Sequence, residues 1–281
     1  MNANTPAAAL DPDLLGAGAA LEPAVRVRRH VIAGILLGGI AALVAFAPAA
    51  WLAAGIASAS GDRLLLADAR GTVWNGSAVM VLTGGAGSRD ASALPGRVAW
   101  SLHLDGAAIG VRVRQECCLA GELRLRVEPG LGRFAIAVPA SQGPMGHWPA
   151  ALLSGLGTPF NTLQLTGSMS LTSGGLVATS AAGRWRLDGN ASLSLDSLAS
   201  RVSTLPELGS YRLALTGGDV TALNLSTTDG PLRLSGTGQW AASGLRFRGE
   251  ARAAPGSEAA LDNLLNLIGR RQGALSVLSI G

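Results

Sequence analysis

The chain contains no lysine, so all 22 of its lysine-or-arginine positions are arginines. This absence excludes a Schiff-base lysine, the phosphate-binding lysine of P-loop proteins and the kinase-type lysine. Three histidines and two adjacent cysteines, Cys117 and Cys118, are too few for a structural zinc site with ordinary ligand spacing. Aromatic residues make up only 4% of the chain, too few for the stacking surface of a nucleic-acid interface. We therefore expect no metal, no cofactor and no nucleic-acid partner.

Catalytic signatures are also missing from the sequence. Nothing matches a Gly-x-Ser-x-Gly elbow, a His-Glu-x-x-His pair or a Gly-x-Gly-x-x-Gly loop that opens a helix. The acidic residues are scattered and mostly stand beside glycine or at the ends of expected strands, where turn formation explains them. The sequence therefore predicts that the protein is not an enzyme, and it offers no catalytic, cofactor-binding or metal-ligating residue.

A charge-free apolar segment lies near the N-terminus. No charged residue occurs between Arg29 and Asp62, and within that gap Val31–Ala50 has no strongly polar side chain. Twenty helical residues span about 30 Å, the thickness of the hydrocarbon core of a bilayer. We therefore expect a single transmembrane anchor over residues 25–52.

The charges that flank this segment predict its orientation. Arg26, Arg28 and Arg29 precede it, and the next basic residue is Arg63. By the positive-inside rule the N-terminus stays in the cytoplasm and the rest of the chain is exported. Residues 1–24, rich in alanine, proline and glycine, are expected to form a disordered cytoplasmic tail.

A cleaved signal peptide is the alternative interpretation of the same segment. Ala45, Phe46 and Ala47 have the small-x-small form of a cleavage site. Pro48 would follow the cut and suits cleavage poorly. The basic region also begins only at Arg26, which is late for a signal peptide. The uncleaved anchor is therefore the favoured interpretation.

From Arg63 onward the apolar residues alternate with a period of two. Low charge (14%) and 39 glycines favour strands and tight turns over a helical bundle. Strict alternation indicates strands with one face on a core and the other in water, and their spacing of about 8–12 residues is typical of all-β proteins. The expected strands are 98–104, 111–114, 123–127, 134–138, 162–165, 168–171, 184–187, 191–195, 211–215, 220–225, 232–234, 245–250 and 275–280.

The expected fold is mainly β: an N-terminal transmembrane helix followed by an antiparallel β-rich periplasmic domain over 61–281, as a curved sheet or a sandwich. Two short helices are expected, at 148–156 and 258–268. Weak internal similarity suggests two halves, 61–143 and 160–281, although meanders reuse such turns in any case. Three tryptophans are expected to point into the core: Trp74, Trp100 and Trp185.

Four outward arginines are expected on one hairpin, with Arg112 and Arg114 on one arm and Arg124 and Arg126 on the other. Like charges that face each other across a hairpin cost stability unless something compensates them. An anionic partner, either lipid headgroups or an acidic protein face, is one source of compensation. The other is the set of neighbouring glutamates, Glu116, Glu122 and Glu128.

The adjacent cysteines leave two interpretations open. Cys117 and Cys118 are either two small hydrophobic side chains in a hairpin loop or a disulfide between neighbours, which an oxidising compartment would permit. Redox catalysis is disfavoured, because there is no Cys-x-x-Cys motif and no adjacent helix start to acidify a thiol.

Two segments resemble a known family. Residues 69–78, ARGTVWNGSA, resemble the first exported strand of type II secretion system protein N, and residues 264–273, LLNLIGRRQG, are similar to the family's ending. The order of anchor, linker, β-region and terminal helix and strand matches over nearly the whole chain. The resemblance implies an accessory subunit of the bacterial inner membrane. It also implies kinship with AsmA-like β-rich proteins, which offer a groove for lipid.

The sequence and the resemblance together predict a function based on binding. We expect a non-enzymatic scaffold subunit, single-pass in the inner membrane, that binds other inner-membrane and periplasmic subunits of the secretion apparatus. The alternative is an AsmA-like protein that binds or transfers membrane lipid. The family supplies no catalytic residues.

Overall fold

The structure is a computed structural model that describes residues 23–182, 184–241 and 244–280. The chain divides into two units, one ending at Phe46 and one beginning at Ala47. Most of the predicted disordered tail, residues 1–24, lies outside the described residues.

The first unit contains one helix, α1 (Pro23–Ala45). The large apolar side chains from Val31 to Val44 on this helix are exposed. In the part of the chain whose placement is described, no helix combines the length and the apolarity that a membrane crossing needs. The anchor over 25–52 therefore stays a prediction.

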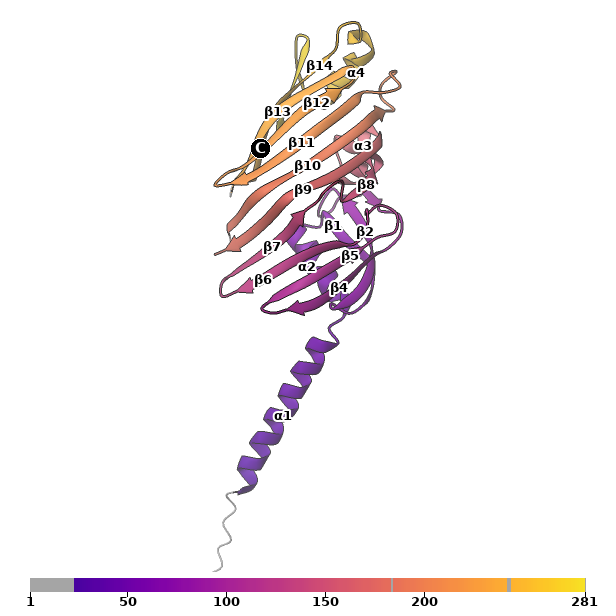
Figure 1. Cartoon of the computed structure of the whole chain (residues 1–281). Coiled ribbons are helices and arrows are strands. Elements are labelled where there is room, and N and C mark those ends of the chain that lie inside the picture. The colour runs from indigo at the N-terminus through magenta and orange to yellow at the C-terminus, as the bar shows by residue number, and fades with distance from the viewer. Residues whose placement is uncertain (1–22, 183, 242–243, 281) are drawn as a thin grey trace, which may run out of the picture. The chain divides into compact units, whose positions relative to one another are not determined.

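The second unit is built on one large antiparallel sheet (Figure 1). Within the described residues it has 16 strands, and β1 and β15 form the two ends of the strand order. The mainly β prediction is confirmed, and of its two forms the structure adopts the single curved sheet rather than a sandwich. The strands are β1 (Leu64–Gly71), β2 (Asn75–Thr83), β3 (Ala91–Ala93), β4 (Val98–Asp105), β5 (Ala108–Arg114), β6 (Leu123–Gly130), β7 (Arg133–Ala140), β8 (Gly146–Pro149), β9 (Leu165–Ala181), β10 (Arg184–Ser200), β11 (Gly209–Gly218), β12 (Thr221–Asp229), β13 (Leu232–Ala241), β14 (Gly244–Ala253), β15 (Arg270–Gln272) and β16 (Leu275–Ile280).

The strand order follows the sequence closely. The path runs β1-β2-β4-β5-β6-β7-β9-β10-β11-β12-β13-β14-β16-β15, with β3 beside β2 and β8 beside β9. Both predicted halves, 61–143 and 160–281, lie in this one sheet, because β7 pairs directly with β9. Tight turns make the meander possible: Gly106 and Gly132, with φ of 62° and 67°, adopt the left-handed conformation that glycine tolerates without strain.

Glycines inside β9 and β10 that suggest turns in the sequence form bulges in the structure. The sequence predicts two short strands at 184–187 and 191–195, but β10 is continuous over Arg184–Ser200. Its register shifts around Gly189, whose φ is 94°. A Cβ at Gly189 would lie 1.7 Å from the carbonyl oxygen of Gly175 on β9, so a bulge here requires glycine.

The strand predicted at 162–165 is wrong over most of its length. Residues Phe160–Leu163 form the short helix α3. Pro159 precedes the helix, where its fixed φ and missing N–H are tolerated, and Gln164 ends it in the left-handed conformation. The helix at Glu258–Ile268 (α4) has the predicted bounds, and the one predicted at 148–156 is a 3₁₀ helix, η2 (Ala150–Leu156).

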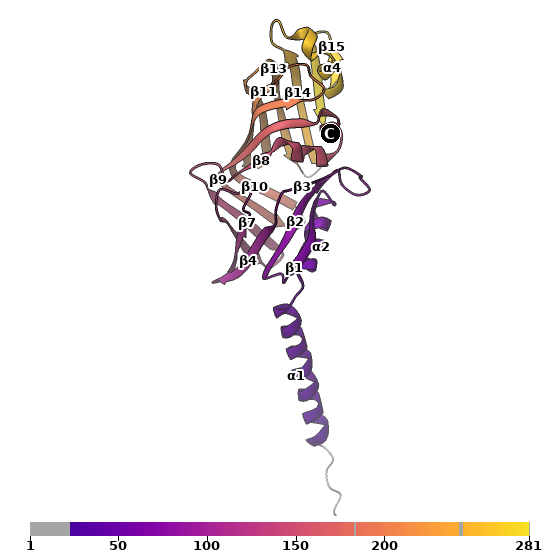
Figure 2. The ribbon, with the colours of Figure 1, turned by 90° about the vertical axis from the view of Figure 1, so that its right-hand side faces the viewer.

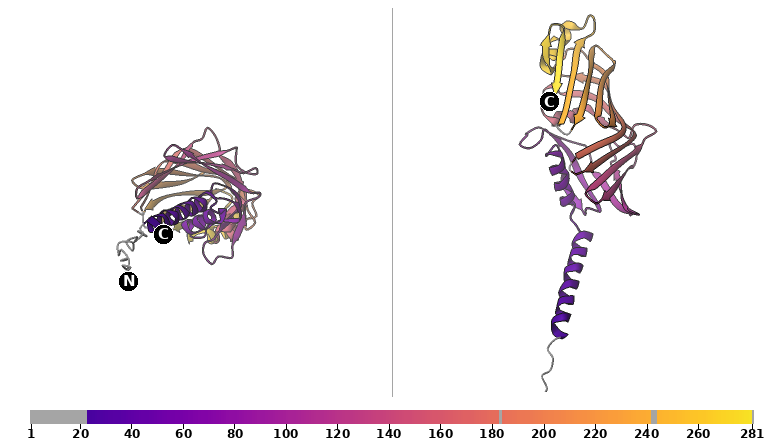
Figure 3. Two further views of the ribbon diagram at one scale, coloured as in Figure 1. Left: turned by 90° about the horizontal axis from the view of Figure 1, so that it is seen from below. Right: turned by 90° about the vertical axis from the view of Figure 1, so that its left-hand side faces the viewer.

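The helices of the second unit lie on one side of the sheet, toward which it curves (Figures 2 and 3). Helix α2 (Ala49–Ser60) packs Ala49 against Ala78 and Trp100 and was not predicted, because its residues were assigned to the anchor and its exit. Helix α4 packs Leu261, Leu264 and Leu265 into a larger core that also contains residues of η2, α3, β9 and β14. Cover therefore lies over β2 and β4 at one end of the strand order and, through η2, α3 and α4, over parts of β9, β10, β11 and β14.

The three tryptophans expected inside behave differently. Trp100 is 6% exposed, and its indole N–H donates a 3.0 Å hydrogen bond to the carbonyl of Val73. Trp74 is half-buried. Trp185 is 61% exposed, so the prediction is wrong for this residue. Trp185 is on the apolar face as expected, but it lies at the end of a hairpin where no core covers that face.

Trp100→Ala should lower the free energy of unfolding by about 3–5 kcal/mol, because it empties a packed site and leaves the Val73 carbonyl unsatisfied. Trp185→Ala is the control, and it should change that free energy by less than about 1 kcal/mol because the side chain is mostly in water. Urea unfolding followed by circular dichroism measures both. Similar losses in the two variants would contradict the assigned burial.

Candidate binding surfaces

Cross-strand register assembles a continuous apolar row across the middle of the sheet. Leu104 of β4 pairs with Ile109 of β5, which pairs with Val127 of β6. The row continues through Ile136, Ala178 and Leu187, and a parallel row joins Leu102, Val111 and Leu125. We call the central part the open apolar face. It consists of Leu104, Ile109, Val111, Leu125, Val127, Ile136, Ala178 and Leu187.

The open apolar face is not part of a packed core. None of its members belongs to, or packs against, the two clusters of buried residues described above. Leu104 is 76% exposed, and the other members are half-buried. Apolar surfaces of this kind on soluble domains usually mark a site of interaction with another molecule. The face can therefore bind an apolar partner without first unfolding anything.

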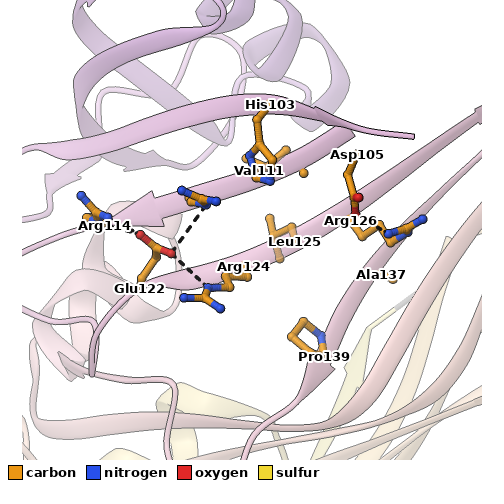
Figure 4. Close-up of a pocket in the computed structure, with 12 residues that line it drawn as sticks. His103, Asp105, Val111, Arg114, Glu122, Arg124, Leu125, Arg126, Ala137 and Pro139 are labelled. Carbon is orange, nitrogen blue, oxygen red and sulfur yellow. Dashed lines mark hydrogen bonds and ion pairs between the residues drawn. The ribbon is translucent and has the colours of Figure 1, made fainter. Parts of the chain in front are cut away.

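The opposite face of the same strands carries the predicted arginines (Figure 4). Arg112 and Arg124 lie directly opposite each other in the β5–β6 register, as like charges on adjacent strands. Glu122 lies between them: it accepts hydrogen bonds from Arg114 at 2.8 Å and from Arg124 at 3.0 Å, and its carboxylate is 3.8 Å from Arg112. One carboxylate thus holds three guanidinium groups.

Arg126 is compensated separately. It donates to Asp105 of β4 at 2.6 Å and to Glu128 at 3.0 Å. His103 lies over Gly110, where a Cβ would come within 2.3 Å of the imidazole, so the absence of a side chain makes room for the ring. His103, Asp105 and Arg126 line a depression of about 780 Å³, together with Glu122 and the other three arginines.

The electrostatics of this arginine surface are largely balanced within the chain. Hydrogen bonds from Arg114, then from Arg124, hold the pKa of Glu122 below its usual value. Four arginines therefore share three carboxylates, those of Glu122, Asp105 and Glu128. Of the predicted glutamates, Glu116 makes no ion pair within the described part of the chain. Local compensation is confirmed, and an anionic partner is not needed to hold the hairpin together.

The adjacent cysteines form a disulfide, so the second of the two interpretations is confirmed. Cys118 is nevertheless buried and belongs to the larger core. Its carbonyl accepts a 2.7 Å hydrogen bond from the backbone N–H of His147, which ties the β5–β6 loop to β8. The contacts of the disulfide therefore indicate a structural role.

Over the described residues, no group of three or more His, Cys, Asp or Glu side chains is placed to hold a metal ion. The prediction that the protein is not an enzyme stays a prediction. The sequence identified the arginines from their alternation and allowed for a lipid groove on the apolar side, but it did not say which residues of that side stay uncovered, because register and packing decide this.

Replacing Glu122 by Gln tests the arginine surface. Because the folded-state pKa of Glu122 is lowered, its carboxylate stabilises the fold above the ordinary carboxyl pKa, and this contribution is lost as pH falls through the lowered value. Glu122→Gln should therefore destabilise the protein at neutral pH and make little difference in strong acid. Urea unfolding at several pH values measures the effect. Glu128→Gln is the control, because in that variant Arg126 still has Asp105 as its ion-pair partner. A pH-independent difference would contradict the assignment.

The chain matches a known protein family over most of its length. The family model described as "Type II secretion system (T2SS), protein N" matches residues 62–277, which is most of the chain and nearly the whole sheet. No curated protein and no solved structure gives a significant match. By this match the chain belongs to the type II secretion system protein N family.

Proposed function

We propose that the protein is a non-enzymatic accessory subunit of the type II secretion system that works by binding. Family membership supports an envelope location and interaction with other subunits of the apparatus. In our proposal the chain is a single-pass protein of the bacterial inner membrane, with a cytoplasmic N-terminus and the sheet in the periplasm. Its partners are inner-membrane and periplasmic subunits.

Two observations support this topology. The apolar segment Val31–Ala50 follows three arginines and precedes a long charge-free stretch, which favours a cytoplasmic N-terminus. The Cys117–Cys118 disulfide is consistent with an oxidising compartment such as the periplasm.

The edges of the sheet are poor docking sites. Helix α2 lies alongside β1 and packs Leu52 near Leu66, so one edge is partly covered (Figure 2). The other end is β15, three residues long with Arg270 and Arg271, and short charged edge strands discourage pairing with another chain. Partners are therefore expected to bind through a face of the sheet.

The open apolar face carries the proposal. It spans six neighbouring strands, and none of its members packs against the two cores that the helices cover. A partner segment with an apolar surface would bury these side chains, and each fully buried aliphatic side chain contributes about 1.5–3 kcal/mol. A few such contacts suffice for a stable complex.

Lipid binding is the second candidate, and one observation favours it. The members of the open apolar face are all aliphatic, without hydrogen-bonding groups among them, and the sheet curves toward this side (Figure 3). Acyl chains need only such a surface, whereas a protein partner usually adds hydrogen bonds at its rim.

Leu125→Asp separates the candidates. Because Leu125 is only half-buried, the variant should stay folded and lose no more than about 1–2 kcal/mol of stability, far less than an unpaired charge in a closed core. We expect loss of secretion subunits that co-purify with the full chain in mild detergent, measured by mass spectrometry. Thr179→Asp, on the opposite face, is the matched control.

The other outcomes are equally informative. Loss of bound lipid with all subunits retained would favour the second candidate. A folded Leu125→Asp variant that keeps both subunits and lipid would contradict both candidates. Global unfolding would show that the face is a closed core.

A further inference from the structure

Five hairpins of the meander meet at one margin of the sheet. In an up-and-down antiparallel sheet every second connection falls on the same side, and the connections β4–β5, β6–β7, β9–β10, β11–β12 and β13–β14 do so here (left-hand side of Figure 1). Helices α3 and α4 lie at the opposite margin. We call the first side the hairpin margin, and the strand ends that meet there are 105 and 108, 130 and 133, 181 and 184, 218 and 221, and 241 and 244.

Exposed large hydrophobic side chains are concentrated on the hairpin margin. Among the described residues after α2, nine large hydrophobic side chains are exposed, and three of them, Val177, Val202 and Leu267, lie elsewhere. The other six lie on the hairpins, at least one on each. They are Leu104 (76% exposed), Leu131 (104%), Phe134 (38%), Trp185 (61%), Val220 (51%) and Trp240 (58%).

Four of these side chains also share the apolar side of the sheet. Leu104 begins the row that forms the open apolar face. Phe134 and Trp185 both pair with Ser180, and their rings meet edge to face with centroids 5.1 Å apart. Trp240 pairs with Thr221 and Leu245 at the far end of the margin. The hairpin margin is therefore the exposed rim at which the apolar side of the sheet ends.

Arginines stand beside the exposed aromatic residues. Arg133 precedes Phe134, Arg184 precedes Trp185, and Arg246 pairs opposite Gln239 next to Trp240. In the part of the chain that the structure describes, none of these three arginines makes an ion pair. Arg186 is different, because it pairs with Asp188 and Asp219. The margin thus combines apolar tips with unpaired cations.

We propose that the hairpin margin contacts the surface of a membrane that contains anionic lipid. Trp185, Trp240 and Leu131 enter the interfacial layer, and the neighbouring arginines lie among the phosphates. Tryptophan prefers this depth, and arginine near a bilayer surface gains from anionic headgroups. The inference rests on the proposed function only in that the sheet works beside a membrane.

The arrangement fits a bilayer better than a protein partner. The exposed side chains are distributed over five hairpins, three of which carry a positive-φ glycine at the turn or beside it: Gly106, Gly132 and Gly244. A protein interface is built around a contiguous desolvated core, whereas an interfacial layer accepts separate insertions. Contact at this rim would also bring the open apolar face next to lipid.

Quenching of tryptophan fluorescence by brominated acyl chains tests the proposal. The full chain carrying Trp51→Phe is reconstituted in vesicles of phosphatidylglycerol and brominated phosphatidylcholine. We expect clear quenching, most of which is lost when Trp185→Phe and Trp240→Phe are added. Trp148→Phe, at the half-buried Trp148 of β8, is the control and should leave the quenching unchanged. Replacing Arg133, Arg184 and Arg246 by Gln should reduce quenching, and so should omitting phosphatidylglycerol.

The results that would contradict membrane contact differ from those that would contradict the proposed function. Equal quenching with and without Trp185 and Trp240 would overturn the proposal, and so would full access of both indoles to acrylamide in vesicles. Secretion subunits that co-purify with the same variants are measured in parallel. If those subunits are lost while bromolipid never quenches the two indoles, the margin binds protein and the proposal is wrong. Retained subunits with lost quenching support membrane contact separately from subunit binding.

Discussion

Alternation of side chains along one long antiparallel sheet is the constraint on which the rest of the second unit depends. Because successive residues point to opposite faces, register places the apolar residues of neighbouring strands on a single side. The row from Leu104 to Leu187 crosses six strands in this way. The described helices cover only part of this sheet, and none of the residues of the open apolar face packs against the two cores.

The described helices cover two separate parts of the sheet. Helix α2 packs Ala49 on Ala78 and Trp100 near β1, and α4 packs Leu264 near Ala251 of β14. These contacts partly cover the edge at β1, and the other edge strand, β15, is short and carries two arginines, which limits unwanted pairing between chains. We propose that interaction instead uses the open apolar face and the hairpin margin. Membership of a secretion-system family is consistent with a subunit built for binding.

The polar face shows how a chain without lysine handles crowded positive charge. The planar guanidinium groups of Arg114 and Arg124 both donate hydrogen bonds to the carboxylate of Glu122. Lysine ammonium groups would share one carboxylate less well, because each is a compact point charge. Arg126 uses Asp105 and Glu128 instead. The arginine surface is therefore largely self-compensated, whereas Arg133, Arg184 and Arg246 at the hairpin margin make no ion pair within the described residues.

Local pattern was enough to predict much of this protein. Period-two alternation predicted β4 and β6, α4 was predicted over its observed bounds, and alternation also placed four arginines on one face. What only the tertiary structure decided depends on pairing between distant residues. The bulge at Gly189, the docking of α2, the choice of Glu122 over Glu116 and the exposure of Trp185 all follow from strand register and from which strands the helices cover. Sequence periodicity specifies which side of a strand is apolar, but burial is a property of what packs against that side.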